Sequence, residues 1–245
     1  MNGETHAIRW GLHLSALTGL AVLLTLGTWQ MKRLSWKEEL LAAIETRMSS
    51  TPEPLAVIEN RFRQSGDIDY YPLKLTGTFI NDGEQYFLST FDGQSGWNIY
   101  TPLQLADRRI VMVNRGFVPY DLRDPSKRPQ SIQSGKSDIV GLARNALGGK
   151  PSSLTPDNDQ KSNTWYWKDL SGMAGNAKAG EDGLLPFFVD DWTETKPDAL
   201  PRTRTTIVSL PNDHLQYAIT WYGLAAALAG VWIVFARTRH SSKSA

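Results

Sequence analysis

Residues 10–29 read WGLHLSALTGLAVLLTLGTW, twenty positions without Asp, Glu, Lys or Arg. A helix of this length crosses the hydrocarbon core of a bilayer, which is about 30 Å thick. Trp10 and Trp29 stand at its two ends, and indole rings are enriched at membrane–water interfaces. The stretch therefore predicts a first transmembrane helix.

A cleaved signal peptide is the alternative interpretation of this segment, because a short basic tail precedes the apolar stretch. No small-x-small cleavage site follows, and a helical pattern continues from Thr28 through Arg47. We therefore expect the segment to be retained as an anchor.

A second stretch without formal charge, HLQYAITWYGLAAALAGVWIVFA, covers residues 214–236 and is followed by Arg237 and Arg239. The tails 1–9 and 237–245 are both short and basic, which favours the cytoplasmic side for each. The first span is also followed by three basic residues, Lys32, Arg33 and Lys37. The tendency of basic residues to stay in the cytoplasm applies to short loops, however, and a long domain crosses the membrane largely regardless of its charge. We expect both termini in the cytoplasm and the central region outside it.

Each predicted span carries small residues at intervals of four, which let helix backbones approach closely in lipid. They predict helix packing, either between the two spans or with the helices of a partner protein. The two rows are Gly11, Ser15, Gly19 and Gly27 in the first span, and Ala218, Tyr222, Ala226 and Gly230 in the second.

The region 30–213 is predicted to be a β-rich domain that begins with an amphipathic helix at 30–48. Pro52 and Pro54 end that helical pattern, and from Tyr70 the apolar residues recur with a period of two. Asn81 to Gly83 predicts a hairpin turn, 92–96 a looser turn, and 123–136 and 171–183 surface loops. The predicted strands are 70–79, 85–91, 97–105, 109–118, 138–143, 185–191 and 205–209.

The fold class that follows is membrane α+β. Two transmembrane helices bracket one extracytoplasmic, antiparallel β-rich domain, which is either a sheet or a small barrel.

Composition excludes several functions. A net charge of +1 without a basic stripe argues against nucleic-acid binding, and the lack of cysteine excludes disulfides and thiolate chemistry. The four histidines are His6, His13, His214 and His240, all in or beside the predicted spans. The central domain therefore has no Ser-His-Asp arrangement and no histidine metal site, and we expect a protein that is not an enzyme and has no catalytic residue.

His214 stands where the second predicted span begins. Helical spacing places Tyr217, Ala218 and Trp221 on its face. Two interpretations are open: an axial ligand to haem iron with the porphyrin against this apolar face, or an interfacial anchor. His13 lies near the opposite membrane face, so we expect that one haem cannot join both histidines of a monomer.

Three phrases resemble signatures of the Surfeit-locus-one family. Residues 26–33, LGTWQMKR, resemble its Leu-Gly-x-Trp-Gln-x-x-Arg, and 212–221, NDHLQYAITW, resemble its Asn-x-His-x-x-Tyr-Ala-x-x-Trp. Residues 113–119, VNRGFVP, resemble Val-Asn-Arg-Gly-Trp-Val-Pro, with Phe117 in place of the usual Trp. Similar phrases at 100–103 and 140–144 extend the resemblance, in order, over nearly the whole chain.

The resemblance implies an assembly factor for haem-copper terminal oxidases, chiefly cytochrome c oxidase, in a bacterial-type inner membrane. It implies binding of haem a for transfer to the catalytic subunit of the oxidase, and a possible second partner in haem A synthase. His214 is then the expected ligand of the haem iron, with Tyr217 and Trp221 beside it. Arg33 and Arg115 are candidate partners of the haem propionates, although we favour a structural role for both. Gly116 is expected to meet a tight backbone requirement in a strand. The alternative is a membrane scaffold without a cofactor that docks on oxidase subunits.

Overall fold

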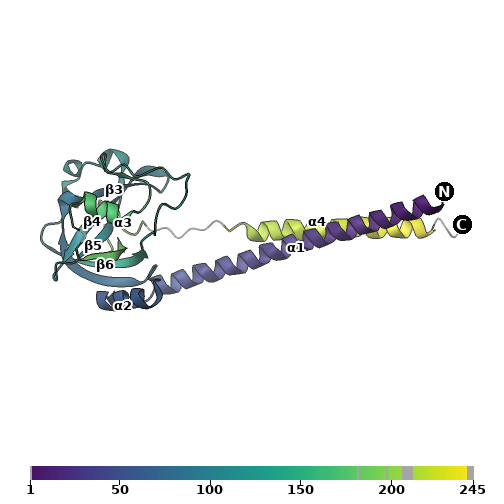
Figure 1. Cartoon of the computed structure of the whole chain (residues 1–245), viewed down its shortest axis with the longest axis horizontal. Coiled ribbons are helices and arrows are strands. Elements are labelled where there is room, and N and C mark those ends of the chain that lie inside the picture. Colours follow the sequence, from purple (N-terminus) through teal and green to yellow (C-terminus); the bar gives the residue numbers. More distant parts are fainter. Residues whose placement is uncertain (1, 181, 197, 206–211, 242–245) are drawn as a thin grey trace. The chain divides into compact units, whose positions relative to one another are not determined.

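The computed structural model describes residues 2–180, 182–196, 198–205 and 212–241. It divides into two compact units, one of residues 1–43 with 208–245 and the other of residues 44–207. Helix α1 (Asn2–Met48) is continuous and ends within the second unit. The first unit is a pair of helices and the second is rich in β-strands (Figure 1).

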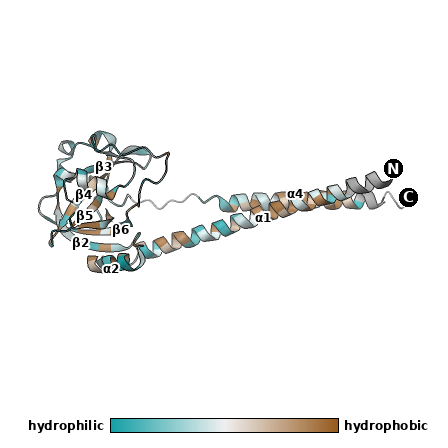
Figure 2. Ribbon diagram, in the orientation of Figure 1, coloured by the Kyte–Doolittle hydropathy of each residue, from teal (hydrophilic) through white to brown (hydrophobic). Residues whose placement is uncertain are grey.

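The helix pair consists of α1 and α4 (His214–Ser241), which lie side by side and antiparallel (Figure 1). Figure 2 shows hydrophobic residues concentrated along α4 and the stretch of α1 beside it. Among the described residues, Trp10–Met48 and His214–Arg237 are long and apolar enough to cross a membrane. Both predicted apolar helices are thus present, and the helical extension at 30–48 is the continuation of α1.

The two helices meet along a seam of buried and half-buried residues spaced alternately three and four apart. This 3.5-residue period is the one that lets two helices stay in contact along a left-handed supercoil. The seam of α1 comprises His13, Ala16, Leu20, Leu23, Gly27 and Gln30, and that of α4 comprises His214, Ala218, Trp221, Ala225, Leu228, Trp232 and Phe235.

The predicted rows of small residues are only partly in this seam. A Cβ on Gly27 would stand 2.8 Å from the ring of Tyr222, and one on Gly19 would stand 3.2 Å from Leu228. Gly11 and Gly230, however, have no atom within 4 Å of such a Cβ. The strict four-residue row was wrong for these positions, because it drifts about 40° around the helix at each step.

The second unit contains a five-stranded barrel. Its strands are adjacent in the order β2-β6-β8-β5-β4, and pairing of β4 with β2 closes the ring. Every pairing in the ring is antiparallel except that of β5 with β8, which is parallel. The strands are β2 (Pro72–Phe79), β4 (Gln94–Leu105), β5 (Ile110–Pro119), β6 (Lys136–Asn145) and β8 (Leu184–Asp191).

The barrel confirms one of the two predicted architectures and corrects the expectation of a wholly antiparallel sheet. A long connection, 146–183, separates β6 from β8. Because the connection is long, β8 is not confined to a hairpin with the strand before it. It lies between β5 and β6, antiparallel to β6 and parallel to β5. The predicted strand at 205–209 lies outside the described residues, apart from Thr205, which is not in a strand.

Strand β3 (Gln85–Phe91) forms a hairpin with the first half of β4, and short strands β1 (Glu53–Pro54) and β7 (Thr164–Trp165) add to the edges. The hairpin turn is Asp92-Gly93, with φ of 51° and 76°, the two positive values of a type I′ turn. Asn81–Gly83 instead forms the 3-10 helix η1, and β2 does not pair with β3. The predicted hairpin at 81–83 was therefore wrong, and the turn predicted as looser at 92–96 is a tight two-residue hairpin at 92–93.

Two helices in this unit were not predicted. Helix α2 (Leu55–Ser65) follows Pro54, and it buries Ile58 against the barrel core. Helix α3 (Leu170–Asn176) lies where we expected an irregular loop, and the carboxylate of Asp169 caps it by accepting a hydrogen bond from the Gly172 N–H. Burial of Met173 and Ala174 outweighs the low helix propensity of its glycines. The predicted loop 123–136 is irregular, with short 3-10 helices η3 (Pro125–Lys127) and η4 (Pro129–Ser131), and η2 (Tyr120–Leu122) precedes it.

An ion pair at the end of α1 gives a testable pH dependence. The guanidinium of Arg47 donates to the Asp67 carboxylate at 2.9 Å, and this hydrogen bond holds the pKa of Asp67 below its usual value. Since the pKa is lower in the folded chain, the stabilisation is complete above about pH 5 and is lost as pH falls through the folded-state pKa. The pair is partly exposed, so we expect less than about 1 kcal/mol.

Urea unfolding of the wild type and of Asp67→Asn should therefore differ at pH 7, and the difference should shrink as pH falls through the folded-state pKa of Asp67. A difference that does not change with pH would contradict an ionic origin. It would assign the loss to the neutral hydrogen bonds of Asp67 with Asp69 and Asn145.

Candidate functional site

The site predicted at the start of α4 has a partner on α1. The Nδ1 atom of His214 lies 2.7 Å from the Oε1 atom of Gln30. Gln30 is 9 % exposed, whereas His214 is half-buried. A polar side chain in a buried seam position thus contacts the histidine, and part of the His214 side chain remains exposed.

This contact, with Oε1 of Gln30 facing the ring, favours one position of the hydrogen on His214. An amide oxygen only accepts hydrogen bonds, so Nδ1 of His214 carries the proton and donates it. Within the described ranges, the other ring nitrogen, Nε2, has no hydrogen-bond partner. Nε2 therefore presents a lone pair, which is the form in which histidine binds a metal ion while its other nitrogen donates to an oxygen.

The aromatic residues predicted beside His214 take different positions. Tyr217 is 54 % exposed, whereas Trp221 is half-buried in the seam. Tyr222 is exposed but its ring lies against Gly27, and its hydroxyl is 3.2 Å from that of Thr28. Tyr217 is thus the more exposed of the two aromatic residues predicted beside His214.

Arg33 follows Gln30 by three residues and so lies one turn further along α1. Its guanidinium stacks over the ring of Trp36, with 4.6 Å between Cζ and the ring centroid. A guanidinium in this exposed position is able to pair with a carboxylate. Pairing of Arg33 with a haem propionate stays a prediction.

His13 lies at the other end of the helix pair. The indole N–H of Trp232 donates to Nδ1 of His13 at 2.9 Å. Trp232 follows His214 by 18 positions on α4, about 27 Å of helix at 1.5 Å per residue. The contacts of the two histidines thus agree with the expectation that a single haem does not join them.

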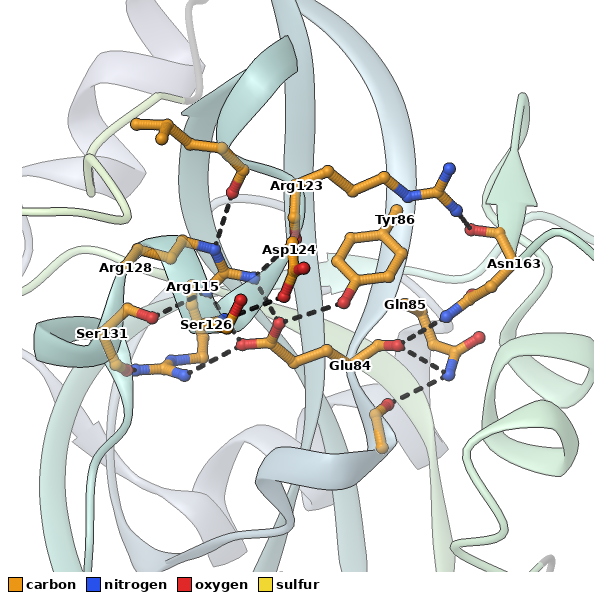
Figure 3. Close-up of polar contacts among 12 residues, drawn as sticks. Glu84, Gln85, Tyr86, Arg115, Arg123, Asp124, Ser126, Arg128, Ser131 and Asn163 are labelled. Carbon is orange, nitrogen blue, oxygen red and sulfur yellow. Dashed lines mark hydrogen bonds and ion pairs between the residues drawn. The ribbon is translucent and has the colours of Figure 1, made fainter.

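Arg115 belongs to the barrel unit and is 3 % exposed. Figure 3 shows it beside Glu84, whose carboxylate lies between the guanidinium groups of Arg115 and Arg128. Nη1 of Arg115 is 3.6 Å from Glu84, and its Nη2 donates to the backbone oxygen of Ser131. Arg128 is 0 % exposed and donates to both carboxylate oxygens of Glu84.

A second carboxylate balances the charge of this cluster. Burial lowers the pKa of Arg115 and raises that of Asp191, and each group favours the charged form of the other. A cavity of about 190 Å³ adjoins Arg115, but Asp138 and Asp191 also line it. An added anion would meet these carboxylates, so the geometry favours a structural role for Arg115 over pairing with a propionate.

Gln30, Glu84 and Arg128 are the important residues that sequence reasoning did not single out. Gln30 is part of the phrase LGTWQMKR, and it is a polar residue at a seam position after four apolar ones, Ala16, Leu20, Leu23 and Gly27. That interruption of the apolar seam is a signal that the sequence does carry. Glu84 and Arg128 carry no comparable signal, because they are ordinary charged residues 44 positions apart.

These observations define a class: a small β-barrel joined to a pair of apolar helices, with a half-buried histidine that contacts a glutamine of the other helix where α4 begins. A sequence model of the SURF1 family matches residues 17–226. Surfeit locus protein 1 of Gallus gallus is 34 % identical over 94 % of this chain and 75 % of its own length. The Homo sapiens protein of the same name is 31 % identical over 92 % and 76 %. A SURF1-like protein of Monosiga brevicollis is 34 % identical over 96 % and 90 %. The chain belongs to the SURF1 family.

Proposed function

We propose that this protein is a non-catalytic assembly factor for a haem-copper terminal oxidase, that it binds haem a, and that it assists insertion of the haem into the catalytic subunit. The observation that carries the proposal is the ring orientation of His214. Its Nδ1 is held by Gln30 at 2.7 Å, and its Nε2 lone pair is free to take a metal.

The residues present fit a haem. When bound, haem iron supplies an electron-pair acceptor for one imidazole nitrogen, and the porphyrin supplies a broad apolar surface. Tyr217 offers an exposed ring next to His214, and Arg33 offers an exposed cation for a propionate. A site on one histidine at a helix end also suits cargo that must be released.

The expected partners follow from this role. The haem recipient is the catalytic subunit of the oxidase, and haem A synthase is the candidate donor. Two apolar helices with the described ends Asn2 and Ser241 at the same end of an antiparallel pair are consistent with anchoring in a membrane. We propose the bacterial inner membrane, with both tails in the cytoplasm and the barrel outside it.

The test is the visible spectrum of the full-length protein purified in detergent from cells that make haem a. The wild type should carry haem a, and His214→Ala should lose most of it because the iron loses its axial ligand. His13→Ala is the matched control, since it removes the histidine of the other helix end, and it should retain the haem.

A colourless wild type would overturn haem binding. It would favour the alternative, a scaffold without a cofactor that docks on oxidase subunits. Haem retained by His214→Ala and lost by His13→Ala would move the ligand to the other end of the pair.

A further inference from the structure

We propose that Gln30 is a positioning residue that fixes the tautomer and orientation of His214, so that Nε2 is the atom presented to haem iron. The haem part of this inference rests on the proposed function. The tautomer part does not, because it concerns the protein without a ligand.

The contact has the features of a built interaction. The 2.7 Å separation between Nδ1 and Oε1 is short for a nitrogen donor, and the accepting side chain is 9 % exposed. Gln30 is also in register with the seam, three residues after Gly27, so packing of α4 against α1 brings its amide to the first residue of α4. The amide of Gln30 therefore joins the two helices and also fixes the ring of His214.

His13 provides the opposite case within the same helix pair. An indole N–H only donates, so Nδ1 of His13 accepts from Trp232 at 2.9 Å and the proton of the neutral ring lies on Nε2. Neither ring nitrogen of His13 then has a free lone pair. The two histidines are thus held in opposite tautomers, and only His214 is prepared to bind a metal.

This difference gives the helix pair a means of selecting one histidine. Partners that accept a hydrogen bond from the other ring nitrogen orient the ligand and make it more basic, and their loss lowers metal affinity by about 10- to 100-fold. We expect that removal of Trp232 takes away the hydrogen bond to Nδ1 of His13. Removal of Gln30 should let the ring of His214 rotate and exchange between its two tautomers.

The first measurement needs no haem. Full-length protein with ¹⁵N-labelled histidine is examined by NMR at a pH where both rings are neutral, because the ring nitrogen shifts distinguish the two tautomers. The wild type should show His214 with the proton on Nδ1, and Gln30→Leu should shift it toward a mixture. Gln30→Glu, which keeps an oxygen acceptor, should retain the wild-type tautomer. An unchanged His214 signal in Gln30→Leu would overturn the inference.

The second measurement titrates the same variants with haem. Gln30→Leu should bind about 10- to 100-fold more weakly than the wild type, and Gln30→Glu should restore binding. Restored binding should come with a higher iron–histidine stretching frequency in the ferrous state, because a carboxylate makes the imidazole more basic. Trp232→Phe is the control for the His214 site, because it leaves the contact between Gln30 and His214 in place, and His214 should bind haem in it as in the wild type.

The outcomes separate the two proposals. If the wild type does not bind haem, the proposed function fails, and the NMR result alone still decides the role of Gln30. If the wild type binds haem and Gln30→Leu binds it equally well with an unchanged stretching frequency, the positioning role is wrong while the proposed function stands.

Discussion

Replacement of Glu84 by Gln should lower the unfolding free energy of the barrel by about 3–5 kcal/mol, the usual result of removing one partner from a buried ion pair. Glu84 is 5 % exposed and lies between Arg115 and Arg128, which are 3 % and 0 % exposed. Gln has the same shape and keeps hydrogen-bonding capacity. The loss would therefore report the two guanidinium groups left facing one another without the carboxylate between them, with Asp191 near Arg115 and Asp124 near Arg128 as remaining charges.

Urea unfolding of the full-length protein, followed by near-ultraviolet circular dichroism, measures this loss. The control is Asp157→Asn, which removes an ion pair with Lys150 whose acidic side chain is 92 % exposed. That change should cost less than about 1 kcal/mol. Equal losses in the two variants would contradict the role given to Glu84.

A double variant sharpens the same prediction. Arg128→Met removes one of the two positive charges, so Glu84→Gln combined with Arg128→Met leaves Arg115 and Asp191 as a balanced pair. The double variant should be less destabilised than the sum of the single changes, because the two residues interact directly. Additive losses would show that the ions act independently.

The two long helices, α1 and α4, and most barrel strands were predictable from the sequence, because each depends on a pattern within one short stretch of residues. Absence of charge over twenty residues identifies a membrane-length helix, and a period of two identifies a strand with one buried face. Strand β3 was predicted with the bounds that the structure gives it, and α1 ends at Met48 as expected. Helices α2 and α3 were not predictable in this way, because their stability comes from burial of Ile58 and Met173 against distant residues.

The candidate site was only half predictable. His214 stands out in the sequence because it begins an apolar helix and lies in a family phrase. Its partner Gln30 lies 184 positions earlier, and no periodicity links two residues across that distance. Arg115 was singled out because it lies in the phrase VNRG that resembles a family signature, and only the fold shows that Glu84, Ser131 and Arg128 surround it.

Gly116 gives the second large effect, because its backbone conformation excludes other residues. Its φ is 114°, a value that side chains rarely adopt, and a Cβ there would stand 2.0 Å from the carbonyl oxygen of Arg202. The next residue, Phe117, exchanges two backbone hydrogen bonds with Arg202, at 2.9 and 2.8 Å. The expectation of a tight backbone requirement at this glycine is confirmed.

Gly116→Ala should therefore lower the unfolding free energy by about 3 kcal/mol, from backbone strain of about 1–3 kcal/mol and weakening of two hydrogen bonds of about 1 kcal/mol each. Gly66→Ala is the control: Gly66 also has a positive φ, 69°, but no atom lies within 4 Å of its added Cβ. That change should cost only about 1–2 kcal/mol.

Hydrogen exchange separates strain from the lost contact. The amides of Phe117 and Arg202 should lose protection in Gly116→Ala and keep it in Gly66→Ala, because only the first change separates the two strands of this bridge. Equal costs and unchanged protection would mean that the close approach of Arg202 is not what requires glycine. With Arg115 bound to Glu84 and Asn114 donating to Asp190 at 2.9 Å, the expected result would make VNRG a phrase that builds the barrel, and would leave cofactor binding to the helix pair.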